Sequence, residues 1–239
     1  MPYTLQRPER SLLLPLSFGF DEDFLEFVSG DLFTDTSADS GAAVAITDAA
    51  GGVVTLTTGG TNNNECALHT TKELFKFAAD KPAFYESRAQ YAEANTDDAN
   101  IYHGWLDAYS ADCMVDDGVG PKSSASGAGF YKVDGGTRWY IFASLGSTQT
   151  KVELTAANSL DNLAKTAGGS SYQVFRVEFR PYSSTQAELL YWIDGVLVYK
   201  ISDFTFTSAT EMHAGAIAKA GGSNSEVLSV DYISVWQKR

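Results

Sequence analysis

The sequence predicts an all-β protein, an antiparallel β-sandwich that follows an extended N-terminal arm. About a dozen runs of β-branched and aromatic residues succeed one another from residue 43 onward, separated by turn-forming Gly, Asp and Asn. No alternation of strands with helices, which a parallel sheet would require, accompanies them. The 239 residues can bury a sizeable core. We therefore expect an arm over residues 1–20 and one sandwich domain over residues 21–239.

The arm differs in composition from the rest of the chain. Three of the six prolines fall within its first fifteen positions, and each fixes φ and removes a backbone donor. Arg7 and Arg10 against Glu9 give it a charge of +1. Two interpretations stay open: the arm packs on its own body as a first strand, or it docks on a partner. The candidates for partner binding are its aromatic, aliphatic and basic side chains, namely Tyr3, Leu5, Arg7, Arg10, Leu12, Leu13, Leu14 and Leu16.

The first half of the body reads as successive strands. AVAIT (43–47) and VVTLTT (53–58) flank the turn-forming stretch Asp48-Ala-Ala-Gly-Gly and predict a hairpin. The further predicted strands lie at 73–78, 83–93, 100–109, 129–133, 138–144 and 150–154. Only the segment 158–167, NSLDNLAKTA, is expected to form a helical turn or two.

The clearest alternation is YQVFRVEFR at 172–180. Its apolar side chains Phe175, Val177 and Phe179 share one face, and its charged side chains share the other. This period of two is typical of a strand with one solvated side. Arg176, Glu178 and Arg180 are therefore expected to face water.

The next segment, ELLYWIDGVLVYKI at 188–201, consists of two strand-like runs that meet at Asp194-Gly195. An Asp-Gly pair between such runs indicates a two-residue hairpin turn, in which both residues need positive φ. No second acid is spaced for chemistry with Asp194, so we interpret it as a turn residue that could also accept backbone hydrogen bonds. The last predicted strands are 213–221 and 226–238.

Charge excludes some partners. A formal charge of −13 repels nucleic acid and anionic lipid surfaces, and no basic patch interleaved with aromatics offsets it. No apolar run approaches the ~20 residues of a membrane helix, and the five-residue LLLPL is shorter than the ~7–15 apolar residues of a signal peptide. We expect neither a membrane span nor a secretion signal.

The two cysteines lack metal-ligand spacing. Cys66 and Cys113 have no neighbouring Cys or His that would complete a zinc site, and two thiols make no disulfide framework. Free thiols are expected. We expect no cofactor, although Asp116 and Asp117 in VDDGVG could offer oxygen ligands to calcium.

The strand FRVEF, the YWIDGVLVYK hairpin and the terminal LSVDYISVWQ resemble, in this order, the second half of concanavalin A-like lectin/glucanase domains. The resemblance is good over 172–239 and loose over 80–239. It implies a jelly roll of two packed sheets more firmly than it implies an activity.

The hydrolases of that group carry two carboxylates on one strand, and this pattern is missing. A retaining mechanism needs an acid and a nucleophile ~5–5.5 Å apart. Glu86 and Glu93 differ by an odd number and point to opposite faces of a regular strand, while Asp107 and Asp112 straddle a strand end. A hydrolase is therefore disfavoured.

Carbohydrate binding without hydrolysis survives this test. An aromatic platform with a few polar groups holds sugars, and the candidates are Tyr102, His103, Trp105 and Asp107. Alternation puts Tyr102 and Trp105 on opposite faces, so one of them belongs to the core. The remaining candidates for core or inter-sheet packing are Tyr191, Trp192, Tyr232 and Trp236.

Three functions compete: a virion structural protein, a lectin and a polysaccharide-degrading enzyme. Jelly rolls of the resembled kind occur as decoration or cement proteins of bacteriophage heads, which need no secretion signal. We expect a non-enzymatic capsid decoration protein that binds the major capsid protein of a phage head through its arm. A dimer or trimer would add avidity, and cell-surface glycans are a possible second ligand.

Overall fold

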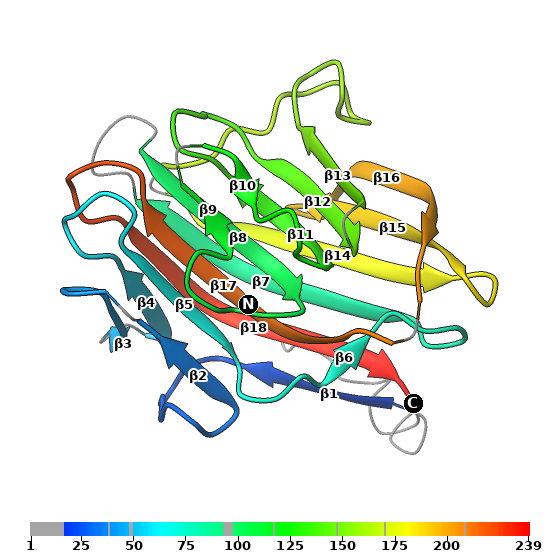
Figure 1. Cartoon of the computed structure of the whole chain (residues 1–239), viewed down its shortest axis with the longest axis horizontal. Coiled ribbons are helices and arrows are strands. Elements are labelled where there is room, and N and C mark those ends of the chain that lie inside the picture. Colours follow the sequence, from blue (N-terminus) through cyan, green and yellow to red (C-terminus); the bar gives the residue numbers. More distant parts are fainter. Residues whose placement is uncertain are drawn as a thin grey trace.

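The structure is a computed structural model of the chain. It describes residues 17–37, 39–47, 50–92, 98–116, 118–146, 148–169, 171–207 and 209–239. These residues form strands and turns, with no helix among them. The described part therefore contains no helix that could cross a membrane. Two large antiparallel sheets lie face to face as a sandwich (Figure 1), which confirms the predicted fold class.

Sheet A contains eight strands and the most regular sequence patterns. Its order is β16 (Val196–Thr205), β15 (Gln186–Ile193), β14 (Gln173–Pro181), β7 (Ala83–Ala92), β18 (Val227–Lys238), β4 (Val53–Thr57) and β3 (Ala43–Thr47), with β1 (Ser17–Glu22) beside β18. The predicted hairpin of β3 and β4 is present, with Ala45 opposite Thr55.

Sheet B also has eight strands. Its order is β13 (Thr148–Glu153), β12 (Tyr140–Leu145), β11 (Gly127–Lys132), β8 (Ala99–Leu106), β17 (Glu211–Ala220), β5 (Glu65–Thr70) and β2 (Phe33–Thr36), with β6 (Phe75–Lys76) beside β17. A separate two-stranded ribbon, β9 (Met114–Val115) and β10 (Gly120–Pro121), lies outside this sheet.

Two predicted elements differ in extent or type. The run at 73–78 pairs only over Phe75–Lys76. The segment 158–167 forms turns and bends without a helix. Its two leucines, Leu160 and Leu163, are largely exposed, and Asn162 has a φ of 59°. The segment does not form a helix because its apolar side chains are not buried and because one of its central residues has a left-handed backbone conformation.

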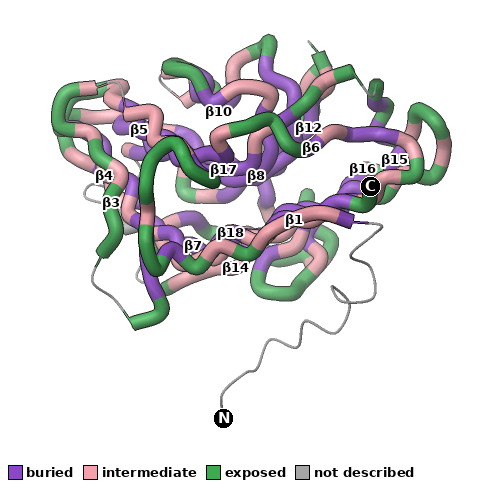
Figure 2. Tube along the Cα trace, turned by 90° about the horizontal axis from the view of Figure 1, so that it is seen from below, coloured by how far each residue is buried: buried purple, intermediate pink, exposed green. Residues whose placement is uncertain are grey.

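The core lies between the two sheets, where buried residues concentrate (Figure 2). Phe175, Val177 and Phe179 of β14 point into it, and Arg180 is exposed, as predicted. Glu178 is mostly covered on the outer face, where it contacts Arg176 and Arg180. The strand alternates as its sequence indicates.

One of the four residues expected in the core is there. Tyr191 is fully buried and donates to the carbonyl of Phe142 in sheet B, 2.8 Å away. Trp192, Tyr232 and Trp236 are half-buried on the outer face of sheet A. The prediction that these three residues belong to the core is therefore wrong. Trp192 follows the inward Tyr191 and must face outward because neighbouring residues of a strand alternate.

The boundary expected after residue 20 falls inside a strand. β1 pairs with β18 along its whole length, from Ser17 opposite Lys238 to Glu22 opposite Ile233. Phe18 stacks on Phe75 with ring centroids 5.4 Å apart. Ser17 to Phe20 are therefore part of the sandwich, because they pair with β18 and the rings of Phe18 and Phe20 pack against the core. The eight partner-binding candidates, Tyr3 to Leu16, lie outside the described residues.

The predicted hairpin turn is confirmed. Asp194 and Gly195 have φ values of 51° and 77°, the left-handed conformation that this turn requires. Asp194 Oδ1 accepts a hydrogen bond from the amide of Val174 at 2.8 Å, and the amide of Asp194 donates to the carbonyl of Val174 at the same distance. Asp194 therefore ties the turn to β14.

Candidate functional site

A segment that we call the flap, formed by residues 107–116 and 118–126, covers the outer face of sheet B (Figure 1). It includes β9 and β10, and its side chains Tyr109, Cys113 and Met114 form an apolar cluster with Tyr102 and Phe142 of the sheet. The base of the flap is closed by a hydrogen bond from the amide of Asp107 to the carbonyl of Ser126, 2.9 Å long. The middle of this face is therefore a second, smaller core.

Three glycines lie next to one another in sheet B, and their backbones are packed closely against the neighbouring strands. Gly129 of β11, Gly104 of β8 and Gly215 of β17 lie side by side in register, and we call them the glycine row. Gly104 has a φ of 149°, and a Cβ atom there would overlap the carbonyl oxygen of Ala128. The Tyr109 hydroxyl instead reaches the carbonyl of Gly104 at 2.9 Å. The carbonyl of Gly104 thus accepts a hydrogen bond from the flap.

The predicted carbohydrate residues do not form an accessible platform. Tyr102, His103 and Trp105 are all 0% exposed, and Asp107 accepts a hydrogen bond from the amide of Ser126 at 3.0 Å. Tyr102 and Trp105 do lie on opposite faces, but the flap covers the first and the inter-sheet core encloses the second. A ring without exposed surface cannot stack on a sugar, so these residues are not carried into the site.

His103 is a core residue. Its ring stacks on Phe175 with centroids 5.0 Å apart, and Nδ1 lies 3.5 Å from Ser87 Oγ. Complete burial lowers the pKa of His103 to about 3, because an imidazolium is costly in an apolar layer. The ring is therefore neutral at neutral pH.

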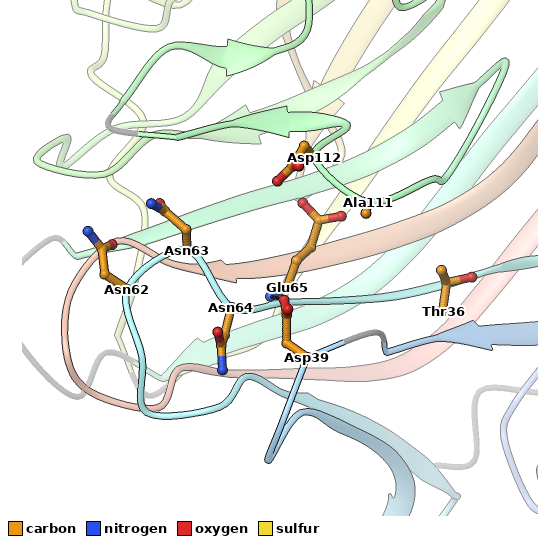
Figure 3. Close-up of a pocket in the computed structure, with 8 residues that line it drawn as sticks. All are labelled: Thr36, Asp39, Asn62, Asn63, Asn64, Glu65, Ala111 and Asp112. Atoms are coloured by element: carbon orange, nitrogen blue, oxygen red, sulfur yellow. Dashed lines mark hydrogen bonds between the residues drawn. The ribbon is translucent and has the colours of Figure 1, made fainter.

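Beside the flap, sheet B has a cavity of about 260 Å³. Side chains from three separate parts of the chain surround it (Figure 3). The lining residues are Thr36, Asp39, Asn62, Asn63, Asn64, Glu65, Ala111 and Asp112. Seven of these eight carry amide, hydroxyl or carboxylate groups, so the cavity wall is strongly polar. We take this cavity as the candidate site.

A buried lysine organises the carboxylates next to the cavity. Lys219 of β17 is opposite Glu65 of β5 and is 0% exposed. Its Nζ lies 2.9 Å from Asp112 Oδ1, 2.5 Å from Asp116 Oδ1 and 3.0 Å from the carbonyl of Met114. Burial alone would lower the pKa of Lys219, but the bonds to Asp116 and Asp112 and the charge of Glu65 outweigh it and raise that pKa.

These contacts bear on the calcium prediction. Asp116 contacts the ammonium of Lys219, and Asp117 lies outside the described residues. Within the described part of the chain, no three His, Cys, Asp or Glu side chains are arranged to hold a metal ion. Asp116 and the carbonyl of Met114 therefore bind the ammonium of Lys219.

Glu65 is the buried acid of the cavity. Its residue is 6% exposed, and its Oε2 has no hydrogen-bond partner among the described residues, with Lys219 Nζ 3.7 Å away. Burial raises the pKa of Glu65 to about 7, although the charge of Lys219 opposes this shift. Asn63 Oδ1 is also buried without a described partner. Two acceptor atoms at the cavity are thus unsatisfied, which costs free energy unless a ligand or water donates to them.

The cysteines are free, as expected, and occupy different layers. Cys66 lies in the core between the sheets and Cys113 lies in the flap cluster. Cys113 Sγ is 3.9 Å from Glu65 Oε1. Burial raises the pKa of Cys113 to about 12. Its thiol is therefore protonated and unreactive at neutral pH.

Comparison with known proteins shows the fold. No protein-family model and no curated protein matches the chain. Among solved structures, the metal-free carbohydrate recognition domain of Emp46p matches with a TM-score of 0.59 at 11% identity, covering 91% of this chain and 95% of that one. An endo-1,3-β-glucanase from Streptomyces sioyaensis matches with a TM-score of 0.58 at 14% identity, covering 92% and 96%.

A third similar structure is peanut lectin with a bound nine-residue peptide, with a TM-score of 0.56 at 10% identity, covering 92% of this chain and 97% of that one. The chain therefore has the jelly-roll fold of concanavalin A-like lectins and glucanases. Lectins and enzymes share this fold, and identities this low carry no activity from one protein to another.

Proposed function

We propose that this chain is a non-catalytic carbohydrate-binding protein and that the cavity beside the flap receives one sugar unit. The observation that carries the proposal is the pair of unsatisfied buried acceptors, Glu65 Oε2 and Asn63 Oδ1. Sugar hydroxyls donate hydrogen bonds to such atoms. A cavity of about 260 Å³ is near the lower end of ligand-site volumes and suits a single ring.

The flap supports the non-catalytic part of the proposal. Glycosidic hydrolysis needs two carboxylates on either side of a bound chain. The centre of this sheet face is instead filled by the buried side chains of Tyr102, Tyr109 and Phe142. Incubation with soluble β-glucans should release no reducing ends, and turnover would contradict this part.

A glycan array with the full chain tests sugar binding. We expect a restricted set of glycans to bind and Asn62→Ala, which removes an exposed amide from the cavity wall, to weaken binding. Asn158→Ala, in the exposed loop after β13, serves as the control and should bind like the wild type. Silence across a broad array would overturn the proposal.

A second proposal concerns where the protein works. We propose that it is a bacteriophage capsid decoration protein, present as a dimer or trimer, that docks on the major capsid protein through residues 1–16. Its support is the position of β1: this strand follows that segment directly and lies at the edge of sheet A, where β18 is its partner among the described strands. A partner chain could extend the sheet from such an edge.

Truncation of residues 1–16 tests this second proposal. We expect the shortened chain to keep its β-sandwich, measured by circular dichroism, and to lose its binding to phage heads that lack the protein. Full binding by the shortened chain would contradict docking through this segment. Light scattering measures the oligomeric state of both forms, and a monomeric full-length chain would contradict the dimer or trimer.

A further inference from the structure

We propose, on the basis of the proposed sugar site, that the sugar unit held in the cavity carries a protonated amino group. The ligand class is then a cationic amino sugar, such as a glucosamine unit, in place of a neutral hexose. The inference rests on the charges around the cavity and on the hydrogen bonds that they lack.

The ionisable side chains that line the cavity are all acidic. They are Asp39 from the connection after β2, Glu65 from β5 and Asp112 from the flap. Figure 3 shows Glu65 and Asp112 pointing toward each other across the upper part of the cavity, with Asp39 on the opposite side of Glu65. A ligand with a positive charge gains attraction from this arrangement, and the net charge of −13 adds to it.

The nearby ammonium of Lys219 satisfies Asp112 but donates no hydrogen bond to Glu65. An ammonium group has three N–H donors, and Lys219 Nζ already has three close oxygen neighbours, in Asp112, Asp116 and Met114. Glu65 Oε2 is at 3.7 Å, beyond hydrogen-bond distance. Lys219 is also fully buried and does not line the cavity. Among the described residues, Glu65 Oε2 therefore has an ammonium at ion-pair distance but no hydrogen-bond donor.

The acceptors suit an ammonium better than a metal ion. Divalent cations such as calcium take six to eight oxygen ligands at short distance, and no group of three metal-ligating side chains exists within the described residues. An ammonium needs only three acceptors, and the oxygen-rich lining of the cavity offers several, with the buried Glu65 Oε2 among them. A charge-assisted bond to a carboxylate is stronger than one from a neutral hydroxyl.

Asp39 is already partly used, and this directs the ligand toward Glu65. Its Oδ2 accepts a hydrogen bond from the amide of Glu65 at 2.6 Å, which fixes the start of β5. Asp112 is mostly exposed, at 76% of its side chain, and stands at the cavity mouth. Asp112 would thus attract the amino group from solvent. Glu65, the buried acid, would hold it in the cavity.

Three trisaccharides that differ mainly at carbon 2 test the inference. Calorimetry with the full chain compares a glucosamine trimer, an N-acetylglucosamine trimer and cellotriose, which carry an ammonium, an acetamide and a hydroxyl. We expect the glucosamine trimer to bind about tenfold more tightly than the other two at neutral pH. The preference should shrink as salt is raised, because salt screens charge attraction.

Two charge-removing variants locate the preference. Glu65→Gln and Asp112→Asn should each reduce binding of the glucosamine trimer about fivefold or more and leave cellotriose binding nearly unchanged. Glu211→Gln makes the same charge change at the exposed start of β17 and should leave all three affinities unaltered. Thermal melting confirms that each variant is folded.

The outcomes separate this inference from the proposed function. Equal binding of the three trimers, or tighter binding of cellotriose, would overturn the amino-sugar inference and leave a sugar site standing. A glucosamine preference that survives both cavity variants would also overturn it. No binding of any trimer together with a silent glycan array would overturn both proposals.

Discussion

The outer faces of the two sheets obey the same alternation of side chains but have different surroundings. On sheet A, Trp236 stacks on Phe84 with ring centroids 6.2 Å apart, and the guanidinium of Arg176 lies 4.7 Å from the Phe84 ring. These side chains remain partly exposed. On sheet B, Tyr102 is completely covered by the flap. Alternation thus predicts which side chains share a face of the sheet, whereas the connections between strands determine whether that face is exposed to solvent.

The largest effect is expected in the glycine row, where neighbouring strands of sheet B approach closely. Gly104→Ala should destabilise the protein by about 3 kcal/mol or more, because the new Cβ would overlap the carbonyl of Ala128 at a positive φ. Urea unfolding measures the change. Gly60→Ala is the control, since its nearest atom would be 3.7 Å away. Equal stabilities of the two variants would show that the glycine row is not needed.

A pair of aromatic truncations compares the two faces directly. Tyr109→Ala should cost about 3 kcal/mol of unfolding free energy, in the range of buried aromatic truncations, while Trp236→Ala on sheet A should cost about 1 kcal/mol. Tyr109 also loses its bond to Gly104. If chemical denaturation gives the same loss for both, the flap is not a core layer.

Between the two faces, His103 makes stability depend on pH. Its folded pKa of about 3 is below the ordinary 6.5, so the folded state resists protonation and stability is lost as pH falls below 6.5. Between pH 6.5 and 5 this loss is about 2 kcal/mol. The unfolding free energy of the wild type relative to His103→Phe should fall by this amount, and a constant difference would contradict the buried neutral ring.

Glu65 should act in the opposite direction. Its folded pKa of about 7 is above the ordinary 4.5, so its stabilising effect is complete below pH 4.5 and is lost as pH rises through 7. Glu65→Gln should gain about 1 kcal/mol of unfolding free energy relative to the wild type from pH 5 to pH 6. The comparison requires denaturation curves at both pH values. A loss instead of a gain would mean that Lys219 holds Glu65 ionised.

The smallest effect is expected on the solvated edge of sheet A. Lys200 contacts Glu188 there with both side chains about a third exposed, and Lys200→Ala should change stability by about 0.5 kcal/mol or less. Thermal unfolding at low and high salt measures it. A cost comparable to that of Tyr109→Ala would erase the distinction between the faces.

Local patterns in the sequence were sufficient for much of the fold. The alternation of Phe175, Val177 and Phe179 and the Asp194-Gly195 turn predict β14 and its hairpin, because strand period and turn chemistry act over a few residues. The same rule separates Tyr102 from Trp105. Alternation does not predict that both Tyr102 and Trp105 are buried, because the sequence of a strand does not indicate which loop will cover it.

The candidate site was beyond such patterns. Glu65 and Lys219 lie far apart in the chain and meet only through the register of β5 and β17. Asn62-Asn63-Asn64 reads as an ordinary polar turn. The sequence shows an excess of acidic residues, but it does not show that three of them line one cavity. Asp112 reaches this cavity only because the flap folds over sheet B.

The glycine row also limits how this part of sheet B can be exchanged with other jelly rolls. Its three positions belong to three different strands, and a Cβ atom at each would lie 2.2–2.3 Å from a backbone oxygen of an adjacent strand. Recombination therefore has to keep the three glycines together, although residues 104–215 span nearly half of the chain.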